Sequence, residues 1–175
     1  MEFEYKKSKI LADLLFGFLF LIFTVFISIL ILNAMINNWN EYQAQNILFS
    51  VISIVLFSVL TYLFLGSAII RNKYYKLNLK EEIKIDSKNK KIIVVHKLNL
   101  LQKEIHFNDI KSVELYYSWN THPFSSDLGY SKLNLFSQEN AIIITQNKLS
   151  QSKIYNLFKS KVIKNKSNFM NSLKL

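Results

Sequence analysis

Two long apolar runs, Ile10–Leu32 and Ile47–Ile70, dominate the first half of the chain. The hydrocarbon core of a bilayer takes about 20 apolar helical residues to cross, and a longer run crosses it with some tilt. A short polar loop without Lys or Arg separates the two runs. We therefore predict an N-terminal transmembrane α-helical hairpin, with helices over about 10–32 and 47–70.

A cleaved signal peptide is the alternative for the first run. The apolar region of a signal peptide spans roughly 7–15 residues and ends at small residues. The run Ile10–Leu32 is longer, and the segment Asn33–Asn38 that follows it is a poor cleavage site. We therefore interpret the first run as a membrane anchor.

Asp13 is the one charged residue in the two runs. A charged side chain at the centre of the membrane costs about 2.5–3.5 kcal/mol on insertion scales. Asp13 lies one turn from the start of its run, within reach of the headgroups and of Lys9. We interpret it as an interfacial carboxylate, and an ion-pathway role is the less favoured alternative.

Basic residues flank the hairpin on one side only. Lysines precede the first run, and Arg71, Lys73, Lys76 and Lys80 follow the second, whereas the loop Asn33–Asn46 has none. Because loops rich in Lys and Arg stay in the cytoplasm, both termini are predicted to be cytoplasmic. Tyrosines at the inner exit suit interfacial anchoring; they are Tyr74 and Tyr75.

The polar half is long enough for one small core. We place the anchor at residues 1–76 and a cytoplasmic β-rich domain with a basic tail at 77–175. Its strands are predicted from alternating apolar residues and from turns rich in Asp, Ser and Asn. They are Tyr75–Asp86, Lys91–His96, Gln102–Phe107, Lys111–Tyr117, Tyr130–Phe136 and Ala141–Thr145, with a long loop at Ser118–Leu128.

Two interpretations stay open beyond Lys148. In one, Ser150 caps a short helix with Ile154, Leu157 and Phe158 on one face. In the other, Lys153–Phe158 is a further strand and Lys164–Leu173 is a closing helix. Both interpretations place a helix late in the chain.

The segment Lys103–Glu114 resembles the bacterial PH-like families, in which I-x-F-x-D-I-x-x-V joins a hairpin to the next strand. The pattern falls on Ile105, Phe107, Asp109, Ile110 and Val113. The resemblance covers Leu77 to about Phe158, and a two-helix hairpin before one such domain is a common layout of these families. It implies an α+β membrane protein with a small PH-like antiparallel β-barrel or sandwich. It also implies a place in the bacterial cytoplasmic (inner) membrane, whereas it implies no activity.

Several classes of chemistry find no support. The chain has no cysteine, and two of its three glycines lie in the apolar runs, so the polar half has no Gly-rich phosphate loop. The histidines show no convergence on a metal site, and surface histidines are the favoured interpretation of His96, His106 and His122. We therefore predict no catalytic residues, metal or cofactor, and a protein that is not an enzyme.

The formal net charge of +10 is concentrated in the polar half, and no acidic residue follows Lys148. A basic domain held beneath an anionic leaflet is attracted to its headgroups. Nucleic acid would be another partner of a basic surface, but no nucleic-acid-binding motif supports it. In the long loop, Trp119 and Phe124 either contact the leaflet or a partner, or pack over the open end of the barrel. The candidate lipid or partner contacts are Arg71, Lys73, Lys76, Lys80, Trp119, Phe124, Lys159, Lys161, Lys164 and Lys166.

These features predict a membrane-anchored, non-enzymatic PH-like module that binds a protein partner or anionic lipid headgroups. The alternative is an immunity protein that protects its cell against a membrane-active peptide or toxin, an expectation that rests on the layout alone. A transporter accessory subunit is less favoured, since only Asp13 could serve an ion pathway.

Overall fold

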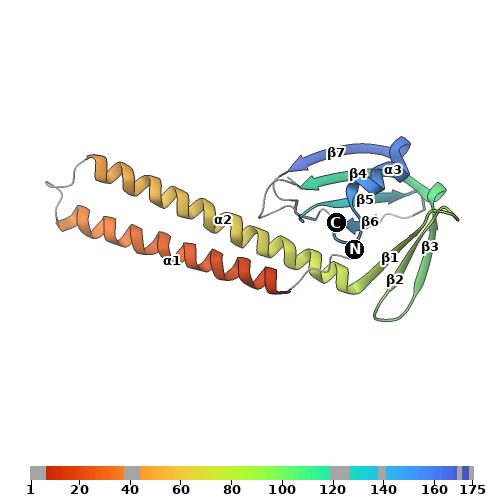
Figure 1. The fold of residues 1–175 in the computed structure, drawn as a ribbon, viewed down its shortest axis with the longest axis horizontal. Coiled ribbons are helices and arrows are strands. Elements are labelled where there is room, and N and C mark those ends of the chain that lie inside the picture. The colour runs from red at the N-terminus through yellow and green to blue at the C-terminus, as the bar shows by residue number, and fades with distance from the viewer. Residues whose placement is uncertain (1–6, 38–43, 119–126, 138–140, 169–170, 174–175) are drawn as a thin grey trace. The chain divides into compact units, whose positions relative to one another are not determined.

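The computed structural model describes residues 7–37, 44–118, 127–137, 141–168 and 171–173. It combines two long apolar helices with two small β-sheets and a late helix, so the predicted α+β class is confirmed (Figure 1). The predicted positions Trp119, His122, Pro123 and Phe124 lie outside the described residues. The chain divides into two compact units. The first, Lys7–Ala68, holds the helix pair, and the second, which holds the sheets, includes Ile69–Leu175.

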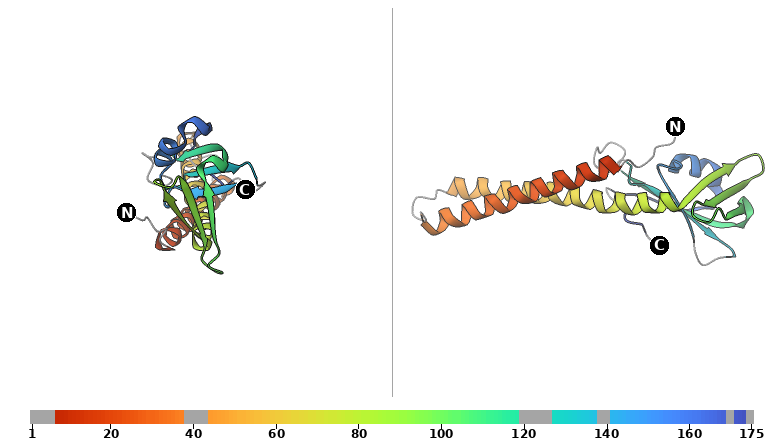
Figure 2. Two further views of the ribbon diagram at one scale, coloured as in Figure 1. Left: turned by 90° about the vertical axis from the view of Figure 1, so that its right-hand side faces the viewer. Right: turned by 90° about the horizontal axis from the view of Figure 1, so that it is seen from below.

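The first unit is a pair of helices that lie side by side (Figure 2). Helix α1 spans Lys7–Asn37 and α2 spans Ala44–Lys80, and both are long and apolar enough to cross a membrane. Phenylalanine rings join the two helices, with Phe20 5.5 Å from Phe64 and 6.0 Å from Phe57 between ring centroids. Many Leu, Ile and Phe side chains of both helices are exposed, as a lipid-facing surface requires.

Close approach of the helices depends on Gly17. A Cβ atom added at Gly17 would lie 2.5 Å from Leu65 Cδ2 and 3.2 Å from the Leu65 backbone nitrogen. Small residues at a helix–helix contact allow the backbones to approach in this way. Asp13, four residues earlier and on the same face of α1, is 7 % exposed. Its side chain therefore points into the protein, whereas its predicted depth at the membrane interface stays a prediction.

Helix α2 continues further than expected. The predicted strand Tyr75–Asp86 is wrong over its first half, because α2 ends at Lys80 and strand β1 spans only Glu81–Asp86. Tyr74 is buried among residues of the sheets, and this packing favours the helical conformation. The compact unit that holds the sheets accordingly begins at Ile69, in the last turns of α2.

The first sheet is an antiparallel meander in the order β1-β2-β3. Strand β2 spans Lys91–His96 and β3 spans Gln102–His106, close to the predicted bounds. Glu81 pairs with His96, so the turn between β2 and β3 lies at the α2 end of the sheet (Figure 1). A short 3-10 helix, η2, at Phe107–Asp109 then leads into the second sheet.

The second sheet has the order β6-β5-β4-β7. Its strands are β4 (Ile110–Ser118), β5 (Tyr130–Leu135), β6 (Ile142–Thr145) and β7 (Val162–Asn168). The pairs β4–β5 and β5–β6 are antiparallel, whereas β4 and β7 are parallel, so the expected purely antiparallel domain is wrong at this pair. A helical crossover explains the difference, because it brings β7 back in the direction of β4.

The crossover is the late helix of the first interpretation. Helix α3 spans Gln151–Phe158, and the Ser150 side chain accepts a hydrogen bond from the Lys153 amide at its N-terminus. The strand at Lys153–Phe158 is therefore wrong. The closing helix at Lys164–Leu173 is also wrong, because Val162–Asn168 after the 3-10 turn η3 (Lys159–Lys161) pairs with β4.

Two buried clusters form the core of the second unit. The larger one joins both sheets and α3, through residues such as Ile92, Leu115 and Ile154. The smaller one contains Tyr74 of α2 together with Tyr116, Leu128, Tyr130 and Ile143. The end of α2 is therefore part of the core of this unit.

We expect Gly17→Val to destabilise the helix pair, because its side chain cannot occupy the space of Leu65 without moving backbone. Overpacking of this kind costs about 1–3 kcal/mol. Thermal unfolding of the full chain in detergent measures the loss. Leu15→Val, at an exposed position of α1, is the control, and equal stability of the two variants would contradict the close contact.

Candidate functional site at the end of the second helix

The last turns of α2 have two opposite faces. Arg71, Tyr74 and Asn78 follow the i, i+3, i+7 spacing of one helical face, and each hydrogen-bonds to the part of the chain that holds the sheets. A second set has the same spacing two residues later and is exposed. This set, which we name the lysine stripe, consists of Lys73, Lys76 and Lys80.

A bidentate ion pair holds the inward face. Arg71 Nε donates to Asp127 Oδ2 and Arg71 Nη2 donates to Asp127 Oδ1, both at 2.8 Å. Arg71 is fully buried, whereas the Asp127 side chain is 17 % exposed. Two parallel charge-assisted hydrogen bonds fix direction as well as distance. We name this pair the Arg71 clamp.

Tyr74 comes one turn after the clamp. Its hydroxyl oxygen lies 2.8 Å from the Asn171 carbonyl oxygen and 3.3 Å from that of Leu128. Its ring contacts Tyr130 edge-on at 6.1 Å, and Tyr130 stacks on Tyr116 at 4.4 Å. Tyr74 is therefore a core residue, and its predicted role as an interfacial anchor is wrong.

Further contacts continue this series to the end of α2. Asn78 Oδ1 accepts a hydrogen bond of 2.8 Å from the Thr145 hydroxyl. The Lys97 amide donates a hydrogen bond of 2.9 Å to the Lys80 carbonyl oxygen. Since a helix rises about 1.5 Å per residue, the contacts from Arg71 to Lys80 cover about 14 Å of the helix axis. They fix the rotation of α2 against the sheets.

The other predicted contact residues have different environments. Lys159 and Lys166 are exposed. Lys161 Nζ donates hydrogen bonds of 2.7 Å to the carbonyl oxygens of Phe107 and Ile110, so it joins η3 to the start of β4. Arg71 is fully buried in its clamp, whereas Lys161 is half-buried.

Lys164 belongs to a polar network around Glu114. Its Nζ lies 3.2 Å from Glu114 Oε2 and 5.4 Å from the centroid of the Tyr116 ring. Burial by itself would raise the pKa of Glu114, but hydrogen bonds from Tyr116, Asn134 and Lys164 outweigh it and lower the pKa. The carboxylate is therefore held in its charged form, whereas a general acid at neutral pH needs a raised pKa.

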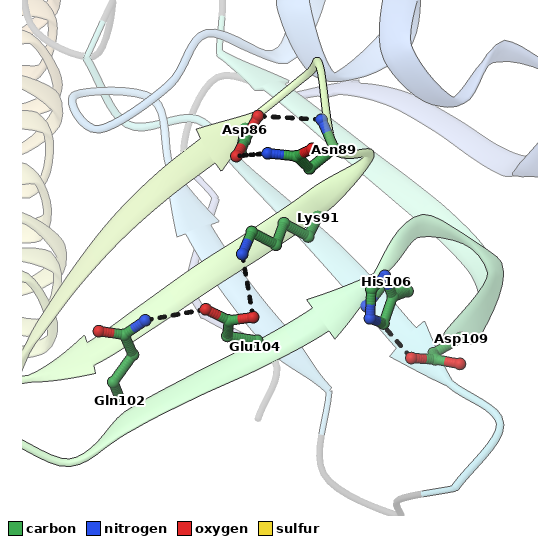
Figure 3. A network of polar contacts seen from close by, with 7 residues as sticks. All are labelled: Asp86, Asn89, Lys91, Gln102, Glu104, His106 and Asp109. Carbon is green, nitrogen blue, oxygen red and sulfur yellow. Dashed lines mark hydrogen bonds and ion pairs between the residues drawn. The ribbon is translucent and has the colours of Figure 1, made fainter.

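Exposed polar contacts tie the first sheet together (Figure 3). Lys91 Nζ donates to Glu104 at 3.0 Å and holds the pKa of Glu104 below its usual value. The His106 amide donates to Asp109 Oδ2 at 3.1 Å, and the His106 side chain is exposed. Among the described residues, no three His, Cys, Asp or Glu side chains gather in a way that could hold a metal ion.

Lys148 is a partly buried amine beside the start of β1. Its Nζ donates a hydrogen bond to the Glu81 carbonyl oxygen. Burial lowers the pKa of Lys148 to about 8, although the carboxylates of Glu81 and Glu82 act in the opposite direction and Lys97 adds to the lowering. This lysine of the basic tail is a structural residue.

The fold and this site define an α+β protein with two candidate membrane-spanning helices and a sheet domain fastened to the second helix. Comparison of the chain with protein-family models, with curated proteins and with solved structures finds no match.

Sequence reasoning did not identify Asp127, Asn171 or Thr145 as partners of α2. The spacing of Arg71, Tyr74 and Asn78 shows that they share one helical face. The exposed lysine stripe has the same spacing, so the spacing alone did not identify the buried face.

We expect Asp127→Ala to destabilise the second unit by about 3 kcal/mol, because it leaves the Arg71 guanidinium buried without its carboxylate. Arg71→Met leaves the Asp127 carboxylate partly exposed to water, so we expect a smaller loss in the free energy of unfolding. Urea unfolding of the full chain in detergent, followed by the near-ultraviolet circular dichroism of tyrosine, measures both. The control is Lys73→Met on the exposed face, and a loss in Asp127→Ala no larger than in this control would contradict the clamp.

We expect the partly buried amine of Lys148 to make the free energy of unfolding depend on pH. The pKa of Lys148 is about 8 in the folded chain and returns to its ordinary value of 10.5 when the chain unfolds, so the unfolded state binds more protons between these values. The contribution of Lys148 to stability therefore rises as pH increases through this window. Urea midpoints compared with those of Lys148→Met at about pH 7 and about pH 10 isolate it. A constant difference between the two proteins would contradict the assignment.

Proposed function

We propose that this chain is a membrane-anchored, non-enzymatic module whose cytoplasmic domain binds anionic lipid headgroups at the inner face of the membrane. The observation that carries the proposal is the lysine stripe, which the Arg71 clamp turns away from the sheets and which begins where the apolar run ends. Exposure of three cations on one helical face at this position suits a negatively charged surface.

The spacing of the stripe fits the dimensions of a bilayer. Lys73, Lys76 and Lys80 follow Ile70 by about 4.5, 9 and 15 Å along the helix axis. The headgroup region is about 5–8 Å thick on each side, and surface charge acts over a Debye length of about 8 Å. Lysine side chains also extend toward the interface. Lys73 and Lys76 therefore reach the headgroups, and each cation near the surface contributes about 1 kcal/mol.

The proposal includes a bacterial cytoplasmic membrane and cytoplasmic termini, which the one-sided placement of basic residues supports. It also includes a PH-like domain, supported by the order of a β-meander, a short turn at Phe107–Asp109 and the following strand Ile110–Ser118. The parallel strand β7 after the late helix departs from the expected layout. Exposed Lys159 and Lys166 add positive charge to the same domain.

Binding of a protein partner, protection against a toxin and a transporter accessory role stay predictions. Among the described residues, no feature favours one of them over headgroup binding.

Amine acylation of the full chain in nanodiscs tests the proposal. In discs that contain phosphatidylglycerol, we expect Lys73 and Lys76 to react several-fold more slowly than in phosphatidylcholine discs, because bound phosphates shield the amines. Added salt should restore the rate. Mass spectrometry reads each lysine separately.

Lys88 is the internal control, since it is exposed in the turn between β1 and β2. Equal rates of Lys73 and Lys76 in the two lipids, with Lys88 unchanged, would contradict headgroup binding.

A further inference from the structure

The turn between β2 and β3 exposes leucines in place of polar residues. We name Lys97–Leu101 the leucine loop; its Leu98, Leu100 and Leu101 are 89, 79 and 63 % exposed. Leu79, in the last turn of α2, is exposed as well. Neighbouring apolar side chains on a surface mark a place that is covered by a partner or a membrane.

The backbone of the loop holds these leucines outward. Leu100 has a φ of 55°, a left-handed conformation that a residue with a Cβ adopts at a cost in free energy. The His96 amide donates to the Leu101 carbonyl oxygen at 2.9 Å, and the Lys97 amide ties the loop to Lys80. The conformation is therefore built in, although the folded unit buries no leucine of the loop in return. The folded unit therefore leaves the apolar side chains of this turn uncovered.

Charge around the loop indicates what covers it. Lys97 lies in the loop, Lys80 is hydrogen-bonded to it through the backbone and Lys103 follows the loop in β3, and all three lysines are exposed. The nearest acidic groups have partners, with Glu104 bound by Lys91 and Gln102 and Glu81 beside His96. A basic rim around an apolar tip suits an anionic lipid interface, in which leucines enter the acyl boundary and lysines bind phosphates. A second copy would bring an identical basic rim against it.

The distance between the end of the apolar run and the leucine loop determines whether the loop can contact the bilayer. Helix α2 is continuous to Lys80, about 15 Å along its axis from Ile70. The loop extends the hairpin by two or three residues beyond the pair of Glu81 and His96, or about 7–10 Å. A helix tilt of about 40° brings Lys80 to roughly 11 Å above the hydrocarbon. If α2 tilts in the direction of the leucine loop, the tip of the loop reaches the headgroup layer.

We propose that the leucine loop inserts into the headgroup–acyl boundary of the inner leaflet and so sets the direction in which α2 tilts. This inference rests on the proposed function, because it adds an apolar anchor to the same anionic surface. In this proposal the lysine stripe binds headgroups where α2 leaves the membrane. The leucine loop forms a second contact with the same leaflet.

Single-cysteine labelling tests the insertion, since the chain contains no cysteine of its own. Leu100→Cys carries an environment-sensitive fluorophore in the full chain, reconstituted in nanodiscs of phosphatidylcholine with and without phosphatidylglycerol. Lipids with a nitroxide on the acyl chain are the quenchers. Ile163→Cys is the matched control, because Ile163 is 69 % exposed and lies on β7.

We expect several-fold stronger quenching and a blue-shifted emission at position 100 relative to position 163, with more quenching when phosphatidylglycerol is present. Leu98→Cys gives a second label, so the test does not depend on one variant folding. Water-like emission and equal quenching at positions 98, 100 and 163 would overturn the insertion.

Lysine acylation in the same discs separates the two proposals. Protection of Lys73 and Lys76 without quenching at position 100 would leave headgroup binding intact and reject the loop anchor. Loss of both signals would reject the proposed function itself. Efficient disulfide formation between two copies at position 100, with no quenching, would also overturn lipid insertion, because it assigns the leucines to contact between copies.

Discussion

The bidentate ion pair between Arg71 and Asp127 is the constraint on which the rest of the second unit depends. A fully buried guanidinium is tolerated only with a partner in good geometry, so the pair permits one rotation of α2 against the sheets. That rotation places Tyr74 in the core and turns Lys73, Lys76 and Lys80 to the opposite face. The surface proposed to bind lipid therefore depends on an ion pair on the opposite face of the helix.

Local patterns in the sequence predicted much of the fold. The length of the two apolar runs predicted the helical hairpin, and the alternation of apolar and polar residues predicted most strands. Ser150, as a capping residue, predicted the start of α3. Alternation failed at Tyr75–Lys80, where leucines two residues apart also fit a strand and the helix is stabilised by partners distant in the chain. It missed β7 because Val162–Asn168 has only two apolar residues and becomes a strand by pairing with β4. Tertiary contacts override local preference at both places.

Positive charge predicted the candidate site only in part, because a count of lysines does not separate structural amines from exposed ones. Lys161 donates hydrogen bonds to backbone carbonyl groups, and Lys164 forms an ion pair with Glu114. Lys73 and Lys76, by contrast, are exposed. The leucine loop was missed for a related reason. Leucines beside predicted strands suggest a core, and only the register of Glu81 with His96 places them at an exposed turn beside the end of α2.

Hydrogen exchange of the full chain in nanodiscs, read by mass spectrometry, tests the central claim that the end of α2 belongs to the sheet domain. The account predicts that amides of Arg71–Lys80 exchange as slowly as those of Ile110–Ser118 and that mild denaturant opens both segments together, as one cooperative unit. Rapid exchange over Arg71–Lys80 beside a protected β4 would contradict it, because the helix end would then open independently of the sheets.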